Sequence, residues 1–214
     1  RILGMGASGD NVGLSENFSV FLNISGGKGD KDATDSEDGF DLDTSSYIVG
    51  ADYRVSDNMV IGASFGWDFY DADYKIDQRV SGGDMSVDTT TLSLFGLYNQ
   101  ENYYLSGIVG YGTSDFDTKR NVFYVSNNPD SAEGADRELT SNSESDQLNF
   151  SLTFGYPIST ESTNFTPYIT IDYLDVNIDA FSENDSASGG LGLQYKSQSI
   201  ESLKAIVGIQ ANWV

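Results

Sequence analysis

The sequence predicts an all-β protein whose strands form a transmembrane, up-and-down antiparallel β-barrel. In residues 148–158 every second position is Leu, Phe, Tyr or Ile, and the positions between them are small or polar. A side-chain period of two belongs to a β-strand with one apolar face. The pattern recurs about eight times, and its connections alternate between short and long, as in bacterial outer-membrane barrels.

The composition favours the same class and excludes several functions. Aromatic residues make up 13% of the chain and there are 23 glycines, which suits strands joined by turns. The chain has no Cys and no His, so thiol and imidazole chemistry are excluded. A net charge of −22 argues against nucleic-acid binding. No apolar stretch approaches the ~20 residues of a transmembrane helix. We expect no cofactor and no enzymatic activity.

Eight strands are expected, each identified by large hydrophobes at alternate positions: 18–24, 47–55, 59–69, 92–98, 103–111, 148–158, 165–173 and 203–213. The Gly-rich residues 1–14 precede the first strand and are interpreted as a linker segment, so the barrel is expected to cover residues 15–214. On the third strand, Ile61, Phe65 and Trp67 alternate with Gly62 and Gly66. Such a strand has a wide apolar face and a nearly bare opposite face.

The connections are expected to be of two kinds. Short turns are predicted at 56–58, 100–102 and 159–164. Long polar loops are predicted at 25–45, 70–89, 113–147 and 175–199, and they contain most of the 33 acidic residues. All long loops then lie at one end of the barrel, as in outer-membrane barrels with short periplasmic turns and long extracellular loops.

The strand faces predict which side contacts lipid. A soluble barrel with its large hydrophobes inside is the alternative, but its surface would then be studded with glycine. Tyr and Trp near strand ends fit the aromatic girdles at membrane interfaces: Tyr47, Trp67, Tyr98, Tyr103, Tyr156, Tyr173 and Trp213. We therefore expect the apolar face to contact lipid and the small, charged face to enclose an aqueous interior.

Several local strings resemble one known family. They are Gly50-Ala51-Asp52-Tyr53-Arg54 with the following hairpin, Tyr104-Leu105-Ser106-Gly107 with Lys119-Arg120, Thr166-Pro167-Tyr168 with Phe181-Ser182-Glu183, and Gln198–Leu203 with Gly208. In order and spacing over residues 18–214, they resemble the C-terminal β-domain of autotransporters, the type V secretion translocators. Barrels of that family have twelve strands, whereas eight are counted here. We therefore expect the last strands of the domain to be missing from this chain.

The resemblance implies an outer-membrane translocator or anchor barrel that secretes or displays an N-terminal passenger. It implies outer-membrane lipid, lipopolysaccharide, the barrel assembly machinery and the passenger as partners, with the acidic loops extracellular. The alternative that stays open is a compact eight-stranded barrel with an adhesin, structural or small-pore role. An eight-stranded barrel fills its interior with side chains, so its loops would then carry the function.

Candidate site residues fall into three groups. Charged residues on the small-residue face are candidates for the lumen or pore: Asp52, Arg54, Asp68, Asp172 and Lys204. Arg120 and Glu183 match family positions near the rim and are expected to form an ion pair there. Calcium is a weak possibility for the acidic run Asp30, Asp32, Asp35 and Glu37, which lacks EF-hand spacing. No catalytic residue and no other metal ligand is predicted.

Overall fold

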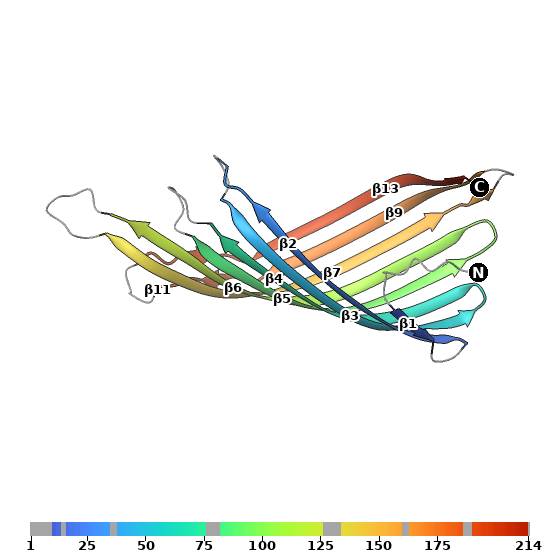
Figure 1. Cartoon of the computed structure of the whole chain (residues 1–214), viewed down its shortest axis with the longest axis horizontal. Helices are drawn as coiled ribbons and strands as arrows, with labels where there is room; N and C mark the ends of the chain where they lie inside the picture. Colours follow the sequence, from blue (N-terminus) through green and yellow to red (C-terminus); the bar gives the residue numbers. More distant parts are fainter. Residues whose placement is uncertain are drawn as a thin grey trace.

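The computed structural model describes residues 10–13, 16–34, 38–75, 82–125, 134–159, 163–185 and 190–213. Among these residues the chain forms β-strands and no helix. The strands lie side by side in a long, curved antiparallel sheet (Figure 1). None of the described residues belongs to a helix long and apolar enough to cross a membrane. The predicted all-β, up-and-down antiparallel fold is confirmed.

Eight long strands follow one another through the sheet in chain order: β2 (Phe18–Lys31), β3 (Phe40–Ser56), β4 (Met59–Tyr74), β5 (Gly83–Asn99), β6 (Tyr104–Tyr124), β7 (Ala135–Gly155), β9 (Thr163–Ile178) and β13 (Gln198–Trp213). Five short strands complete the described part: β1 (Asp10–Gly13), β8 (Ile158–Ser159), β10 (Phe181–Ser182), β11 (Asn184–Asp185) and β12 (Gln194–Tyr195). β1 pairs with β2, β8 with β9 and β11 with β7, while β10 and β12 pair with each other.

The short connections lie where the sequence predicts them. The β3–β4 turn is closed by the Asn58 N–H, which donates to Ser56 Oγ at 3.3 Å. The Asn58 side-chain amide also donates to Asn99 O at 2.8 Å, which ties this turn to the end of β5. Between β5 and β6, the Gln100 N–H donates to Tyr103 O at 2.8 Å. Of the predicted turn 159–164, residues 160–162 lie outside the described part.

Three of the four predicted long loops, 25–45, 70–89 and 113–147, are wrong over most of their length, whereas most of 175–199 does connect β9 to β13. The strands continue far into these three: β2 reaches Lys31 and β3 already begins at Phe40, for example, and β6 and β7 run to Tyr124 and from Ala135. The predictions stopped each strand where its large outward hydrophobes ended. Beyond that point the backbone keeps its ladder of hydrogen bonds while both faces change composition, so the strands project past the apolar belt.

The register separates two faces. One row of successive cross-strand partners is apolar throughout: Val20, Ala51, Ala63, Leu94, Val109, Phe150, Tyr173 and Leu203. The adjacent row on the other face is Phe21, Gly50, Ser64, Ser93, Gly110, Asn149, Leu174 and Ser202. On β4 the first face is apolar from Met59 to Phe69, about 34 Å of strand. At a tilt of about 45° it spans ~24 Å, close to the apolar band of a membrane barrel.

The second face is the inner, concave one. Phe21 on β2 and Phe95 on β5 belong to strands separated by β3 and β4, yet their ring centroids are 6.0 Å apart. They meet because a Cβ on Gly50 or Gly62 would lie 2.2 Å from the Phe21 or Phe95 ring, so only glycine leaves room for the rings between the strands. The apolar outer face is exposed: Phe150, Phe154 and Val207 are 39, 43 and 79% exposed. This arrangement is opposite to that of a soluble barrel with a dry centre.

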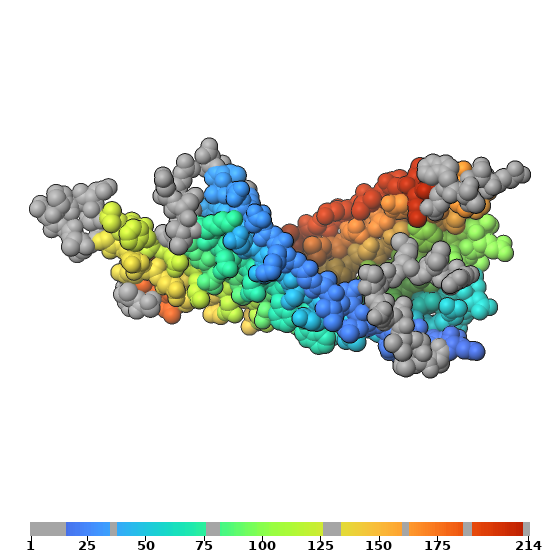
Figure 2. Space-filling view, viewed as in Figure 1, coloured from blue at the N-terminus to red at the C-terminus, as the bar shows by residue number. Residues whose placement is uncertain are grey.

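The two borders of the sheet differ in their pairing. β2 is flanked by β1 over Asp10–Gly13, whereas β13 pairs only with β9 among the described residues. In Figures 1 and 2, blue β2 and red β13 lie at different sides of the elongated sheet. The missing neighbour explains why Leu203 and Val207 on β13 are 73 and 79% exposed, about twice the fraction of Phe150 in the middle of the sheet.

Candidate functional site

The lumen candidates lie on the inner face, on four strands. Asp52 of β3 lies between Ser19 and Gly62 in the register, and Asp68 of β4 lies between Ser46 and Thr89. Arg54 is two residues from Asp52 on the same strand, so it shares that face. Asp172 of β9 and Lys204 of β13 are direct register partners. The inner wall therefore carries all five predicted charges.

The structure brings together only part of this set. Asp172 accepts a hydrogen bond of 2.6 Å from Ser151 Oγ. Around it lies a shallow cavity of about 240 Å³, lined on the inner face by Asn149, Ser151, Asp172, Leu174, Ser202 and Lys204. Within the described part of the chain, no hydrogen bond or ion pair joins any two of the five candidates. They form a dispersed polar lining and not a constellation that could act on a substrate.

Hydroxyl groups complete this lining. Thr89 and Ser114 Oγ atoms are 2.8 Å apart, and the hydroxyl oxygens of Thr153 and Thr170 are also 2.8 Å apart. The inner face is not uniformly polar, however, because its rows also contain Ile48, Phe95, Ile108, Leu174 and Ile200. From the sequence, only small and charged residues were expected on the inner face, so these apolar side chains are an unpredicted feature. The wall can thus contact both polar and apolar parts of a chain within the barrel.

Beyond the belt the two faces exchange character. Outward positions become acidic, as at Asp43 and Asp71, which are cross-strand partners, and at Asp117. Several inward positions of the extensions are apolar, whereas Ser114, Ser141 and Ser145 on the same face are buried and polar. The apolar ones are Leu42, Ala72, Met85, Val87, Phe116 and Leu139. Four apolar residues are buried in the described part of the molecule, and all lie on this inner face near the loop end: Ala72, Val87, Ala135 and Leu139. The strand extensions therefore form a wall that is acidic outside and lined by apolar and hydroxyl side chains inside.

The rim candidates Arg120 and Glu183 meet at this end. Arg120 projects inward from β6 and donates from Nε and Nη2 to the two carboxylate oxygens of Glu183 at 2.7 and 2.6 Å. The Glu183 side chain is only 6% exposed. Its hydrogen bonds with Arg120 hold the pKa of Glu183 below its ordinary value and raise that of Arg120. This geometry orients the segment that carries Glu183.

A second, parallel ion pair has no counterpart in the sequence analysis. Arg137 of β7 donates from Nη1 to both carboxylate oxygens of Asp185 at 3.1 Å. The Asp185 side chain is 7% exposed. Asp185 follows Glu183 by two residues, and Arg137 lies two residues from Leu139 on the inner face of β7. In the sequence, only the pattern Glu-x-Asp after β9 could have indicated this ion pair, and many other acidic pairs in the chain have the same spacing.

Of the four calcium candidates, only Asp30 and Asp32 lie among the described residues. Asp35 and Glu37 lie outside the described residues. Asp30 and Asp41 are register partners, and Asp32 and Asp41 lie 3.9 and 3.1 Å from Lys75 Nζ. In the part of the chain that the structure describes, no group of three acidic side chains has an arrangement that could hold a metal ion.

Comparison with known proteins agrees with the geometry. The family model for the autotransporter beta-domain matches residues 20–214. Outer membrane protein A of Rickettsia rickettsii is 25% identical over 194 residues, which are 89% of this chain and 8% of that protein. Esterase EstA of Pseudomonas aeruginosa is 22% identical over 204 residues, 92% of this chain and 30% of the esterase. The chain thus spans less than a third of the length of these relatives.

Among solved structures, the translocator domain of the autotransporter NalP from Neisseria meningitidis superposes with a TM-score of 0.68 at 17% identity. The match covers 91% of this chain and 62% of that one. At this identity the likeness shows the fold, whereas the family match covers nearly the whole chain. The sheet has an apolar belt of the height that a membrane requires and an inner face lined by polar residues and glycine. Together with the family match, these features show that the chain belongs to the autotransporter β-domain family and is an outer-membrane β-barrel domain.

Proposed function

We propose that this domain anchors an N-terminal passenger in the bacterial outer membrane and exports it through the barrel interior. The observation that carries the proposal is the division of faces within the belt: Val109 and its row contact lipid, and Asp172, Ser151 and Lys204 line the interior. A polar lining with scattered apolar residues suits passage of an unspecified polypeptide better than recognition of one solute. The family match supports the same role.

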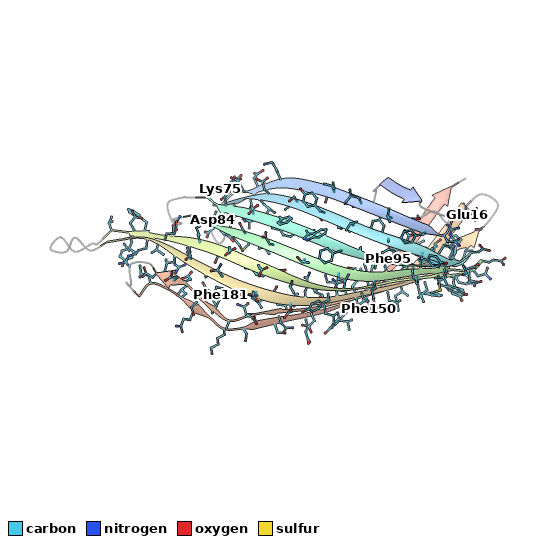
Figure 3. The ribbon with its side chains drawn as sticks, turned by 90° about the horizontal axis from the view of Figure 1, so that it is seen from below. Glu16, Lys75, Asp84, Phe95, Phe150 and Phe181 are labelled. Atoms are coloured by element: carbon cyan, nitrogen blue, oxygen red, sulfur yellow. The ribbon has the colours of Figure 1, made fainter. Side chains whose placement is uncertain are left out.

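We infer further that the strand extensions point to the cell exterior. In Figure 3, Lys75, Asp84 and Phe181 lie toward one end of the sheet and Glu16 lies at the other. The first end carries the long connections and the acidic wall, and the second carries the short turns. Barrels of this class place short turns in the periplasm. Lipopolysaccharide would then surround the outer half of the belt, and the barrel assembly machinery would insert the domain.

The edge of β13 that has no partner among the described residues indicates how many strands the closed barrel has. Backbone groups exposed to lipid cost several kcal/mol each, so the N–H and C=O groups on the outer edge of β13 need partners in a membrane. A twelve-stranded barrel, to which this chain contributes eight long strands, supplies such partners. A compact eight-stranded barrel would need β13 to pair with β2, and no such pairing occurs among the described residues. We therefore favour the translocator over the compact adhesin or structural barrel.

This role requires no catalysis by the barrel. The match to esterase EstA covers 30% of that protein, and we assign its esterase chemistry to the part outside the match. The linker role of residues 1–14 is compatible with β1, which runs antiparallel along β2 from Asp10 to Gly13. The chain thus descends toward the short-turn end before it turns into the first long strand, as a passenger linker inside or beside the barrel would.

The proposal is tested with the full-length protein in a Gram-negative host, carrying an epitope tag in its N-terminal region. Protease added to intact cells should remove the tag, and deletion of residues 18–214 should leave it protected. The chain has no native Cys, so single cysteines report topology with a membrane-impermeant maleimide. N142C should react in intact cells and D57C only after permeabilisation. A protected tag in the intact protein, or the reverse labelling, would contradict export or orientation respectively.

A further inference from the structure

The connection between β9 and β13 first continues along the edge of β7, and its return leg then contacts Arg120 on the inner face of the barrel wall. We name residues 181–185 and 190–195 the strap. Its β11 pairs with β7 through Asn184–Thr140 and Asp185–Leu139. Arg120 and Leu139, which contact or pair with it, both lie on the inner face, and Leu139 is 0% exposed. β11 therefore extends the sheet beside β7, and the return leg lies on the inner face, where Leu191 contacts Arg120 and Asp185.

The strap is a folded unit in its own right. β10 and β12 pair through Phe181–Tyr195 and Ser182–Gln194, and the rings of Phe181 and Tyr195 stack with centroids 4.5 Å apart and an interplanar angle of 17°. The Glu183 N–H donates to Leu193 O at 2.9 Å. At Gly192 a Cβ would lie 2.7 Å from Glu183 O, so the two legs approach more closely than a side chain allows.

Two nearly buried carboxylates join this unit to the wall. Glu183 accepts from Arg120 of β6 and, through Oε2, from the Leu193 N–H of the return leg at 2.9 Å. Asp185 accepts from Arg137 of β7 and from the Leu191 N–H at 3.3 Å. Arg120 also donates to Leu191 O at 3.2 Å. Each carboxylate thus links one wall arginine to one backbone N–H of the strap, and removal of either arginine takes an ion-pair partner from a nearly buried carboxylate.

We propose that the strap narrows the outer mouth of the barrel, that the Arg120–Glu183 and Arg137–Asp185 pairs hold it against the wall, and that its release widens the exit for the passenger. The proposal rests on the translocator function above. The return leg of the strap lies on the face that encloses the exported chain and at the end where that chain leaves. Among the described residues the strap's contacts with the wall include two ion pairs and the β11–β7 pairing, and their separation would leave the β6–β7 ladder intact.

The closed position is tested by the reactivity of a cysteine beneath the strap. In the full-length protein, L139C should react with an impermeant maleimide at least tenfold faster when R120A and R137A are added. N142C on the opposite face of the same strand is the matched control and should react equally in both backgrounds. If R120A/R137A fails to assemble, as judged by heat-modifiable gel mobility, the near-isosteric pair E183Q/D185N replaces it. Equal rates for L139C with and without either pair would overturn the closed position.

The effect on export is tested with a disulfide. Thr140 and Asn184 are register partners, so T140C/N184C joins the strap to β7 at a separation that a disulfide can bridge. Arrival of the passenger at the surface should slow at least threefold and recover when a reductant is added. D117C/N142C joins β6 to β7 without involving the strap and should have no effect. An unchanged rate in the T140C/N184C protein would overturn gating, whereas absence of the passenger from the surface of wild-type cells would contradict the translocator function itself.

Discussion

Ile108 and Val109 allow the assignment of the two faces to be tested at neighbouring positions. They are adjacent on β6 and equally exposed, at 39 and 41%, but they point to opposite faces. Val109 belongs to the apolar row between Leu94 and Phe150, and Ile108 lies between Phe95 and Ser151 on the inner face. Because a Lys on the lipid face near the bilayer midplane costs ~2–4 kcal/mol, V109K should lower the free energy of unfolding by that amount. I108K keeps its charge in the aqueous interior and should cost about 0.5 kcal/mol, as for an ordinary exposed site.

The measurement is urea unfolding in phospholipid vesicles, followed by the fluorescence of the two tryptophans, Trp67 and Trp213. Because the two positions are about equally exposed, a difference in burial cannot account for a difference in stability between V109K and I108K. Because both lie next to each other in the middle of β6, a difference in strand propensity cannot account for it either. Heat-modifiable mobility of both variants shows whether the barrel assembles before the free energies are compared. A soluble barrel with its apolar side inside gives the opposite order. If I108K proved as costly as V109K, or costlier, the lipid-facing assignment would be refuted.

Three further outcomes are expected. A Cβ at Gly155 would lie 2.2 Å from the Tyr104 ring, so G155A should cost about 1–3 kcal/mol through overpacking in urea unfolding. G66A, whose Cβ meets nothing closer than 3.6 Å on the same inner face, should be nearly neutral, and Y104A should abolish the effect of G155A. A double-mutant cycle of F21A and F95A should give a coupling of about 0.5–1.5 kcal/mol for the ring pair, and additive effects would count against their contact. The pKa of Glu183 lies below its ordinary value of 4.5, so its stabilisation of the strap is complete above the unfolded pKa and is lost as pH falls below about 4.5. Hydrogen exchange in the strap should increase over that range, and E183Q should remove this part of the pH dependence.

The part of the fold within the lipid belt is predictable from the sequence because lipid imposes a simple rule. Every outward residue there must be apolar and every second residue is outward, so Met59 to Phe69 identify β4 directly. The inner residues add little signal, since glycine, serine and isoleucine all fit. Gly50 and Gly62 illustrate the limit: their role depends on Phe21 and Phe95, which lie on other strands and approach only in the folded sheet.

The strand extensions are a different case, because their signal is present in the sequence but in the opposite phase. Residues 41–43, 71–73 and 115–117 read Asp-Leu-Asp, Asp-Ala-Asp and Asp-Phe-Asp, which is alternation with a period of two. A search for outward hydrophobes reads these segments as polar loops. Arg120 and Glu183 were identifiable only through their resemblance to family positions. Arg137 and Asp185 had no such support, and their pairing depends on where the strap folds.

The phase reversal also marks where the membrane ends. Tyr47 and Trp67 are register partners on the outer face, Ser45 and Phe69 form the next outward row, and Asp43 and Asp71 are partners in the row after that. On β6 and β7, Tyr111 and Leu148 are outward partners, and the next outward rows pair Thr113 with Asp146 and Asp115 with Glu144. Because carboxylates facing hydrocarbon are costly, we expect the lipid boundary on each of these strands to lie between its last apolar and its first acidic outward residue. Outside it, water replaces lipid, the hydrophobic effect again favours apolar residues on the inside, and the same sheet continues with its faces exchanged. The buried apolar residues of the strand extensions therefore follow from the length of the strands: a barrel that projects into water favours apolar side chains on its inner face there, as at Leu139, Val87 and Ala72.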